Sequence, residues 1–146
     1  MRNFDVKKYI EEGKTTYSKR KDIEALADKV TARGYNNIVI IGIGGTWAEW
    51  HPVVHVMKHY TDLPIYLENA AELCIKKDKR YLTKDSLVIT VSASGDTKEI
   101  LAAVKMCKEM GIEVAGFTKN NETPLAKELD YIIANPCGDC EDSYMM

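Results

Sequence analysis

The 146-residue chain has no excess of basic residues and no long apolar run. Its 20 Lys and Arg are outnumbered by 22 Asp and Glu, which gives a formal net charge of −2. A nucleic-acid partner requires a basic face, and the basic residues here are scattered among acidic ones, so we expect no nucleic-acid binding. No stretch reaches the roughly 20 apolar residues of a membrane span, and residues 1–8 lack the apolar core of a secretion signal. We therefore expect a cytoplasmic protein without a membrane partner.

Cysteine is also scarce. Of the four cysteines, Cys137 and Cys140 have the spacing of a redox or zinc pair, but the sequence offers no second pair. A structural zinc site needs four ligands, and neither Cys74 nor Cys107 has a histidine at ligand spacing. We expect reduced thiols, no bound metal and no cofactor.

Apolar segments typical of strands alternate with amphipathic segments typical of helices. The strand segments are 38–41, 63–67, 87–91, 112–117 and 131–134, and the helical segments are 22–33, a helix beginning near 46, 68–75, 97–110 and 123–129. We expect Pro52 to kink or split the second of these helices. Strands separated by helices predict a doubly wound parallel α/β sheet, because parallel neighbours need helical crossovers of one hand.

The loops after the first and third strands suggest the strand order. In an open parallel sheet the ligand lies beyond the carboxyl ends of the strands, where the order reverses. A five-stranded sheet in order 2-1-3-4-5, a flavodoxin-like three-layer αβα sandwich, places the 42–46 loop beside the 92–97 loop. One small ligand can then touch both. We expect one such domain over residues 22–136, with a helical extension at 1–21 and a tail at 137–146.

The 92–97 loop, Ser-Ala-Ser-Gly-Asp-Thr, lies where the third strand gives way to a helix. Three hydroxyls, a glycine and the first free N–H groups of a helix converge there. A helix N-terminus carries about half a positive charge, so we predict a phosphate site. The alternative is that Ser94 and Thr97 only cap the helix.

The 42–46 loop has features of a dinucleotide fingerprint. Gly42 and Gly44 open a strand-to-helix turn, and Glu68 stands near the place of a ribose-binding acid. The third glycine of the fingerprint falls at Trp47, whose bulk we expect to prevent close approach of helix and strand. A nucleotide cofactor is therefore the weaker alternative.

With Gly44-Gly45-Thr46 after the first strand and Ser92-Ala-Ser-Gly-Asp-Thr97 after the third, the chain resembles the sugar isomerase (SIS) domain family. That family comprises phosphosugar isomerases, deglycases, etherases and sugar-phosphate-sensing regulators. The resemblance runs from about Ile23 to Ile133. Gly-Gly-Thr-Trp-Ala and Ser-Gly-Asp-Thr-Lys-Glu-Ile are most similar to the branch that includes fructoselysine 6-phosphate deglycases. The resemblance implies a phosphorylated sugar or amino-sugar derivative as ligand.

The resemblance also implies roles for single residues. The phosphate-binding groups are three hydroxyls and three backbone N–H groups, those of Ser92, Ser94 and Thr97 and of Ala93, Gly95 and Asp96. The sugar phosphate is also contacted from the first loop, by Gly44, Gly45 and Thr46. Hydroxyls donate to phosphate without adding charge, and glycine lets the main chain approach closely. Because a carboxylate repels phosphate, we expect the Asp96 side chain to point outward.

Catalytic residues are harder to place. Family isomerases use a glutamate base and a histidine for ring opening, usually from sequence beyond the fifth strand or from a second subunit. Here the candidates are Glu49 as base, His51 as acid, and Glu68 at the end of the second strand. His51, His55 and His59 share a helical face, but no carboxylate completes a metal site, so we expect a solvent-facing or subunit-facing stripe.

Two functions stay open. One is a sugar-phosphate isomerase or deglycase whose active site is completed by a partner subunit or a second SIS domain. The other is a non-catalytic sugar-phosphate-binding or regulatory module. We expect a homodimer, a higher oligomer, or pairing with a second SIS domain, and the short sequence after the fifth strand favours the first half of a longer protein.

Overall fold

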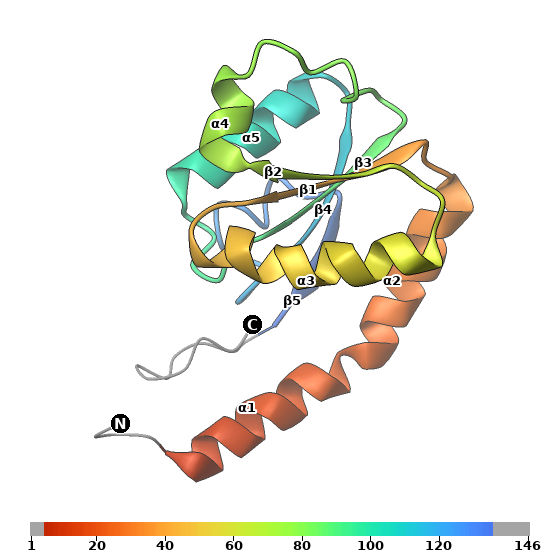
Figure 1. Ribbon diagram of the computed structural model, residues 1–146. Helices are drawn as coiled ribbons and strands as arrows, with labels where there is room; N and C mark the ends of the chain where they lie inside the picture. The colour runs from red at the N-terminus through yellow and green to blue at the C-terminus, as the bar shows by residue number, and fades with distance from the viewer. Residues whose placement is uncertain (1–4, 136–146) are drawn as a thin grey trace.

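The computed structural model describes residues 5–135, which form a parallel sheet covered by helices on both faces (Figure 1). The strand order is β2-β1-β3-β4-β5, so the predicted fold and order are confirmed. In chain order the elements are α1 (Val6–Ser18), α2 (Arg20–Arg33), β1 (Asn37–Gly42), α3 (Gly45–Tyr60), β2 (Ile65–Asn69), α4 (Ala70–Ile75), β3 (Ser86–Val91), α5 (Lys98–Glu109), β4 (Glu113–Thr118) and β5 (Tyr131–Ala134).

The central strands β1 and β3 are apolar on both faces because helices cover both. Val39, Ile40 and Ile41 of β1 are fully buried. In the register Ile41 pairs with Thr90 of β3 on one side and with Glu68 of β2 on the other. All strands run in the same direction, so their carboxyl ends and the loops that follow them lie at one edge of the sheet.

The two faces of the sheet carry different helices. The helices α4 and α5 cover one face, where Ile41 and Val88 pack with Leu73, Ile100 and Val104. Figure 1 shows α3 and α2 on the other side. There α3 packs its buried Val54 against β1 and β2, and α2 packs its buried Val30 against β3 and β5. This second face holds the cavity described below.

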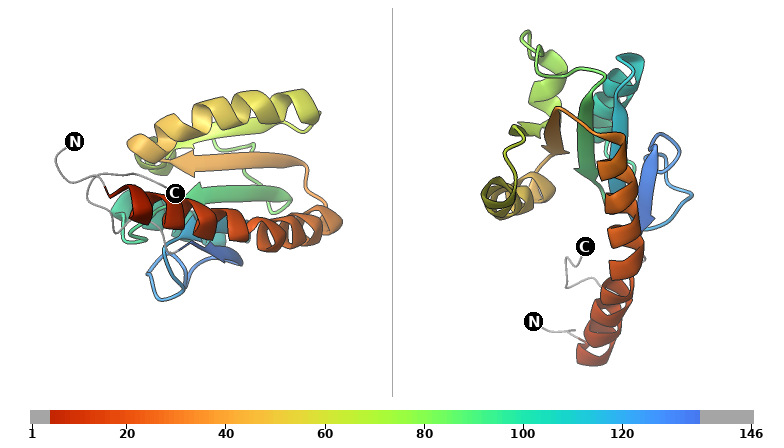
Figure 2. Two further views of the ribbon diagram at one scale, coloured as in Figure 1. Left: turned by 90° about the horizontal axis from the view of Figure 1, so that it is seen from below. Right: turned by 90° about the vertical axis from the view of Figure 1, so that its right-hand side faces the viewer.

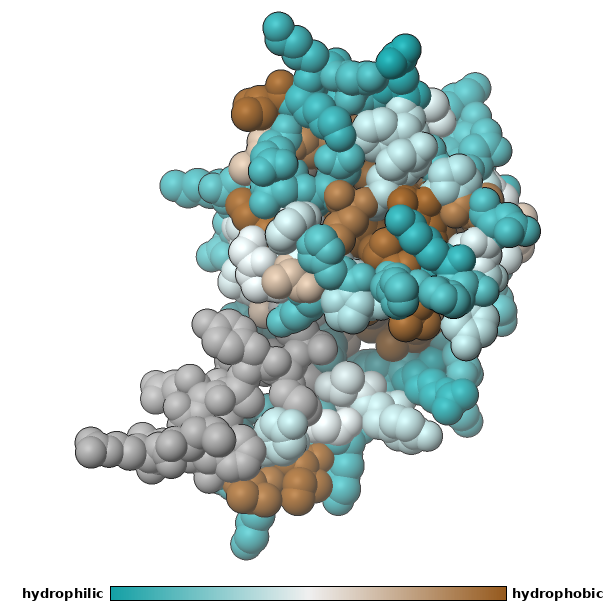
Figure 3. Space-filling model, viewed as in Figure 1, coloured by the Kyte–Doolittle hydropathy of each residue, from teal (hydrophilic) through white to brown (hydrophobic). Residues whose placement is uncertain are grey.

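The helix α1 projects beyond the sheet, as the two views of Figure 2 show. Asp5 caps it by accepting from the backbone N–H groups of Lys7 and Lys8, but none of its side chains is buried. Its aliphatic residues Val6 and Ile10 are 56% and 50% exposed, and an apolar patch lies over the projecting helix in Figure 3. Near its end the Thr16 hydroxyl accepts from the Asn135 amide at 3.2 Å, which ties α1 to the end of β5.

Two local expectations, a helix over residues 123–129 and a split of α3 at Pro52, are wrong. Residues 123–129 form turns rather than a helix, because Leu125 donates its N–H to Gly95 O and Ala126 donates to the Thr123 hydroxyl instead of bonding in helical sequence. Pro52 does not split α3, which runs unbroken from Gly45 to Tyr60. Because proline has no N–H, the Ala48 carbonyl does not receive the helical hydrogen bond that residue 52 would normally donate. Ala48 and Pro52 both face solvent, so water can bond to that carbonyl instead.

No helix within residues 5–135 is both long and apolar enough to cross a membrane. The predicted thiols Cys74 and Cys107 lie in α4 and α5. Cys137 and Cys140 lie outside the described residues.

Candidate functional site

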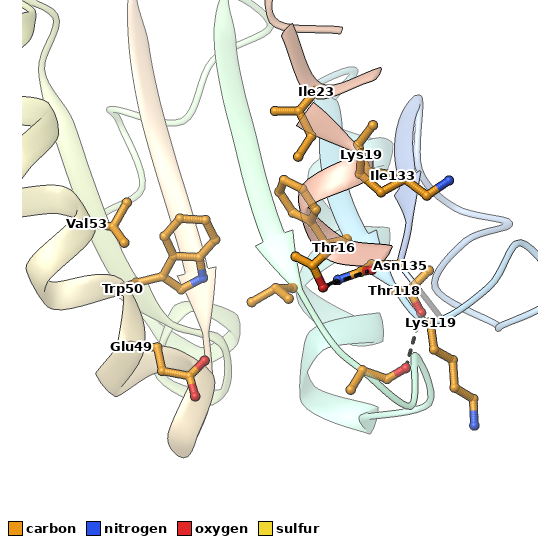
Figure 4. Close-up of a pocket in the computed structure, with 13 residues that line it drawn as sticks. Thr16, Lys19, Ile23, Glu49, Trp50, Val53, Thr118, Lys119, Ile133 and Asn135 are labelled. Carbon is orange, nitrogen blue, oxygen red and sulfur yellow. Dashed lines mark hydrogen bonds between the residues drawn. The ribbon is translucent and has the colours of Figure 1, made fainter. Parts of the chain in front are cut away.

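A cavity of about 310 Å³ opens at the carboxyl edge of the sheet, between α3 and the α1–α2 pair. Figure 4 shows Glu49, Trp50 and Val53 on its α3 side, facing Ile23 and Lys19 across the gap. The ends of three strands form the rest of the wall, with Val91, Ala93, Phe117, Thr118, Lys119, Ile133 and Asn135. Its volume lies at the lower end of the range for small-molecule sites.

The 92–97 loop borders this cavity through Ala93. Ser92 is buried and organises the loop from inside, because its hydroxyl oxygen accepts from the Gly95 N–H at 3.1 Å and lies 3.1 Å from the Thr97 hydroxyl oxygen. The N–H of Gly95 is therefore used within the loop. This corrects the prediction that it faces a ligand.

The predicted alternative, that Ser94 and Thr97 act only as helix caps, is wrong. Thr97 is the N-cap residue of α5, but its side chain makes no capping hydrogen bond. Ser94 is exposed and donates its hydroxyl to the carboxylate of Asp96, which is also exposed. Asp96 points outward as expected.

The first turn of α5 has unused donors. Its own hydrogen-bond ladder begins with Leu101, whose N–H donates to Thr97 O at 3.0 Å. Within residues 5–135, no acceptor is bonded to the backbone N–H groups of Ser94, Asp96, Lys98 or Glu99. Unpaired N–H groups at a helix N-terminus are the usual setting for a bound anion.

Gly95 is required where it stands. Its φ is +67°, a region that favours glycine, and a Cβ there would lie 2.5 Å from Thr123 Cβ and 2.8 Å from Thr118 Oγ1. The loop therefore packs its backbone directly against the end of β4 and the turn that follows.

The 42–46 loop starts α3 at the neighbouring strand end. Gly44 has a φ of +58°, and Gly45 begins the helix. The Thr46 hydroxyl donates to Ile43 O at 2.9 Å and accepts from Ile43 N at 3.2 Å, so its one proton is used within the loop. The three predicted sugar-contacting residues thus lie at the expected place, with the Thr46 hydroxyl turned to its own backbone.

The expectation that Trp47 prevents close approach of helix and strand is wrong. A Cβ on Gly42 would lie 2.7 Å from the Trp47 Cα. The close approach is made by the backbone of α3, and the glycine that permits it belongs to β1. The Trp47 side chain instead contacts His51, with ring centroids 4.4 Å apart.

The catalytic candidates are not brought together. Glu49 lines the cavity, whereas His51 is exposed on α3 beside Trp47. Glu68 pairs in register with Ile41, whose side chain belongs to the α4–α5 core, so Glu68 lies on the opposite face from the cavity. Its predicted position beside the cleft is wrong.

Glu68 serves a different cluster. Its Oε1 accepts from Lys76 Nζ at 2.8 Å and from the Tyr81 hydroxyl at 2.6 Å. Burial and the hydrogen bond to Glu68 raise the pKa of Tyr81 to about 12, and the Glu68 hydrogen bond raises the pKa of Lys76 as well. The three groups form a closed structural cluster that joins β2 to the segment after α4.

The histidine stripe is exposed, as expected. The rings of His55 and His59 lie 5.0 Å apart, and His59 Nδ1 lies 2.9 Å from His55 O. Within residues 5–135, no three His, Cys, Asp or Glu side chains are placed to hold a metal ion together.

Several residues that line the cavity were not among the site residues predicted from the sequence. Thr16 lies in α1 and Lys19 in the turn between α1 and α2, while Lys119 and Asn135 follow β4 and β5. One signal was available for the last two, because polar residues that directly follow parallel strands gather at the same edge of the sheet. No comparable pattern marks Thr16 or Lys19.

Comparisons with known proteins agree on one family. The family model "SIS domain" matches residues 32–141. The glutamine–fructose-6-phosphate aminotransferase [isomerizing] of Corynebacterium diphtheriae is 26% identical over 131 residues, which cover 90% of this chain and 20% of that protein. The chain therefore spans about a fifth of that relative's length.

Two solved structures are also similar. A candidate phosphosugar isomerase from Bacillus subtilis is 27% identical with a TM-score of 0.67, over 73% of this chain and 32% of that one. An Escherichia coli CFT073 protein, solved in complex with a ligand, is 25% identical with a TM-score of 0.66, over 92% of this chain and 77% of that one.

Proposed function

Because the chain belongs to the SIS domain family, we propose that it binds a phosphorylated sugar or amino-sugar derivative. The phosphate binds at the N-terminus of α5, against the 92–97 loop, and the sugar extends into the adjoining cavity. The observation that carries this proposal is the set of unpaired backbone N–H groups of Ser94, Asp96, Lys98 and Glu99, which lie in and just after the loop whose Ala93 lines that cavity.

The electrostatics favour a phosphate there. The N–H groups and the dipole of α5 supply partial positive charge. The exposed Ser94 hydroxyl, which donates to Asp96 in this structure, turns its proton to the phosphate in this proposal. Lys98 is exposed at the start of the helix, and the exposed Lys119 donates its backbone N–H to Ala93 O in the loop. These two ammonium groups offset the repulsion from the Asp96 carboxylate.

We propose that the bound sugar phosphate is a substrate for isomerisation or deglycation. Glu49 is the one carboxylate of the described residues that lines the cavity, and it is the base in this proposal. It removes a proton from a sugar carbon and returns it to the neighbouring carbon. No histidine of the described residues lines the cavity. The ring-opening acid in this proposal is therefore a group from a partner, or His51 if its exposed side chain turns toward the bound sugar. The second candidate function is a non-catalytic sugar-phosphate-binding or regulatory module.

A partner completes this proposal. The exposed Val6 and Ile10 of α1 support contact with a second copy of the chain, a higher oligomer, or a second SIS domain. We also propose the division into an extension at 1–21, the phosphosugar-binding domain at 22–136 and a tail at 137–146. The absence of buried side chains from α1, which ends at Ser18, supports an amino-terminal extension, and the proposed boundary falls two residues into α2.

Isothermal titration with fructose 6-phosphate, glucosamine 6-phosphate and fructoselysine 6-phosphate tests binding. We expect at least one to bind, and Ser94→Ala to weaken it about tenfold, the loss of one hydrogen bond to a charged group. Ser18→Ala is the matched control, because Ser18 is also exposed and bonds only locally, to Thr15 O. If none of the three binds the wild type, or if both variants bind alike, the proposed phosphate site is wrong.

A coupled assay on the same sugars separates the two functions. The enzyme proposal requires turnover that Glu49→Gln abolishes while affinity stays within about twofold, since an amide cannot accept the proton. Binding without turnover by the assembled protein would favour the non-catalytic module.

A further inference from the structure

Two buried threonines lie behind the 92–97 loop. Thr118 ends β4 and is 2% exposed, while Thr123 lies in the following turn and is 5% exposed. Their hydroxyl oxygens are 3.1 Å apart. Buried hydroxyls need partners, and this pair points toward the backbone of the loop rather than into an apolar core.

The threonine pair belongs to a chain of hydrogen bonds that ends on the loop. The Ala126 N–H donates to Thr123 Oγ1 at 3.1 Å, and Thr118 Oγ1 donates to Ala93 O at 3.5 Å, the long limit for such a bond. Thr123 Oγ1 also lies 3.4 Å from Asn120 O, so its single proton has an acceptor in either Thr118 Oγ1 or that carbonyl. Both threonine hydroxyl protons then have an acceptor.

The same side of the loop is fixed by two backbone donors. Lys119 N–H donates to Ala93 O at 3.3 Å, and Leu125 N–H donates to Gly95 O at 2.9 Å. Gly95 also packs directly on Thr123, with no room for a Cβ between them. Both loop carbonyls therefore face β4 and its turn.

Fixing these carbonyls orients the N–H groups that follow them. In a planar trans peptide the C=O of one residue and the N–H of the next point in opposite directions. With Ala93 O and Gly95 O turned toward the threonine pair, the N–H groups of Ser94 and Asp96 point away from it. These are two of the N–H groups that have no hydrogen-bond acceptor within residues 5–135.

We propose that Thr118 and Thr123 are positioning residues for the anion site, which hold the 93–94 and 95–96 peptide planes so that both N–H groups face the phosphate. The inference rests on the proposed function, because it concerns the same site. It adds that Thr118 of β4 and Thr123 of the turn after it orient the N–H groups of the site, although neither side chain contacts the ligand.

The test compares Thr123→Val with Thr123→Ser and with Thr90→Val. Valine keeps the volume and removes the hydroxyl, while serine keeps the hydroxyl. Thr90 is the matched control, because it is fully buried in β3 and its hydroxyl donates to Ile41 O at 3.0 Å, within the sheet. The probes are inorganic phosphate and glucosamine 6-phosphate, each titrated against the full chain.

We expect Thr123→Val to weaken binding of both probes about tenfold, Thr123→Ser to restore it, and Thr90→Val to bind like wild type at a similar loss of stability. Amide NMR gives a readout that general destabilisation does not move. The phosphate-induced shifts of the Ser94 and Asp96 N–H signals should shrink in Thr123→Val and persist in Thr90→Val. If Thr123→Val does not fold, Thr118→Val takes its place in the same comparison.

The outcomes distinguish the two proposals. If the wild type binds neither probe and none of the three sugar phosphates titrated above, the phosphate site itself is wrong and the inference falls with it. If the wild type binds and the folded Thr123→Val or Thr118→Val variant binds equally well with unchanged Ser94 and Asp96 shifts, only the positioning role is overturned.

Discussion

The contact between Gly42 of β1 and the first turn of α3 allows a sharp test of local packing. Gly42→Ala places a Cβ 2.7 Å from Trp47 Cα, 2.8 Å from Trp47 N and 3.1 Å from Thr46 C. All three are backbone atoms, so no side-chain rotation relieves the contact. Gly45→Ala makes the same chemical change three residues later, where a Cβ meets nothing within 4 Å.

The expected magnitudes follow from this geometry. An ordinary Cβ contact is 3.4–4 Å, so the start of α3 must move by several tenths of an ångström in Gly42→Ala. Overpacking of this kind costs about 1–3 kcal/mol. Both variants reduce the entropy of the unfolded chain, which stabilises the fold by about 0.4–1 kcal/mol at a compatible site. We expect Gly45→Ala to be neutral or slightly stabilising, and Gly42→Ala to be less stable than it by about 1–3 kcal/mol.

Urea denaturation monitored by tryptophan fluorescence gives the two free energies of unfolding, with equal m-values as the check on two-state behaviour. The unfolded-state effect is common to both variants, so their difference isolates the contact. Free energies equal within about 0.5 kcal/mol would refute the close approach of α3 to β1 as described.

Two further predictions concern the amino-terminal edge of the sheet and the core. Glu113→Ala should lower the free energy of unfolding by about 1–3 kcal/mol in urea titrations. The reason is that the Glu113 carboxylate accepts hydrogen bonds from the Tyr35 and Tyr131 hydroxyls at 2.6 and 3.4 Å. Glu109→Ala is the control and should have little effect, because Glu109 is exposed. Burial raises the pKa of the Cys107 thiol to about 12, so its contribution to stability is complete below pH 9 and lost as pH rises from 9 to 12. The wild type should therefore lose about 1–3 kcal/mol relative to Cys107→Ala between pH 8 and pH 11, and a constant difference between them over this range would contradict the buried thiol.

The sheet was predictable because its signals are local. The run 38–41 is apolar throughout and 87–91 is apolar apart from Thr90, a pattern typical of strands with both faces covered. The loops that follow these two strands indicate where the strand order reverses. The order 2-1-3-4-5 then follows from requiring one ligand to reach both loops. The position of the 92–97 loop at the start of α5 was predictable for the same reason.

The parts that sequence reasoning missed depend on distant contacts. Glu68 lies one residue past Leu67, so strand alternation turns it to the α4–α5 face, but the side of the sheet that each helix covers comes only from packing. Residues 123–129 have helical spacing, yet the hydrogen bond from Leu125 to Gly95 outweighs it. The hydrogen bond from the Gly95 N–H to the Ser92 hydroxyl, which removes that N–H from the anion site, likewise appears only in the three-dimensional structure.

The anchoring of the 92–97 loop by Lys119 and Leu125 has a consequence for the order of folding. The loop carbonyls find their partners about 25 to 30 residues later in the chain. A nascent chain that has emerged only as far as α5 holds the whole Ser-Ala-Ser-Gly-Asp-Thr sequence but lacks the groups that orient its peptides. We therefore expect the anion affinity proposed above to appear late, when β4 and its turn have docked, and a phosphate bound there to stabilise the carboxyl-terminal half of the sheet as well as the loop.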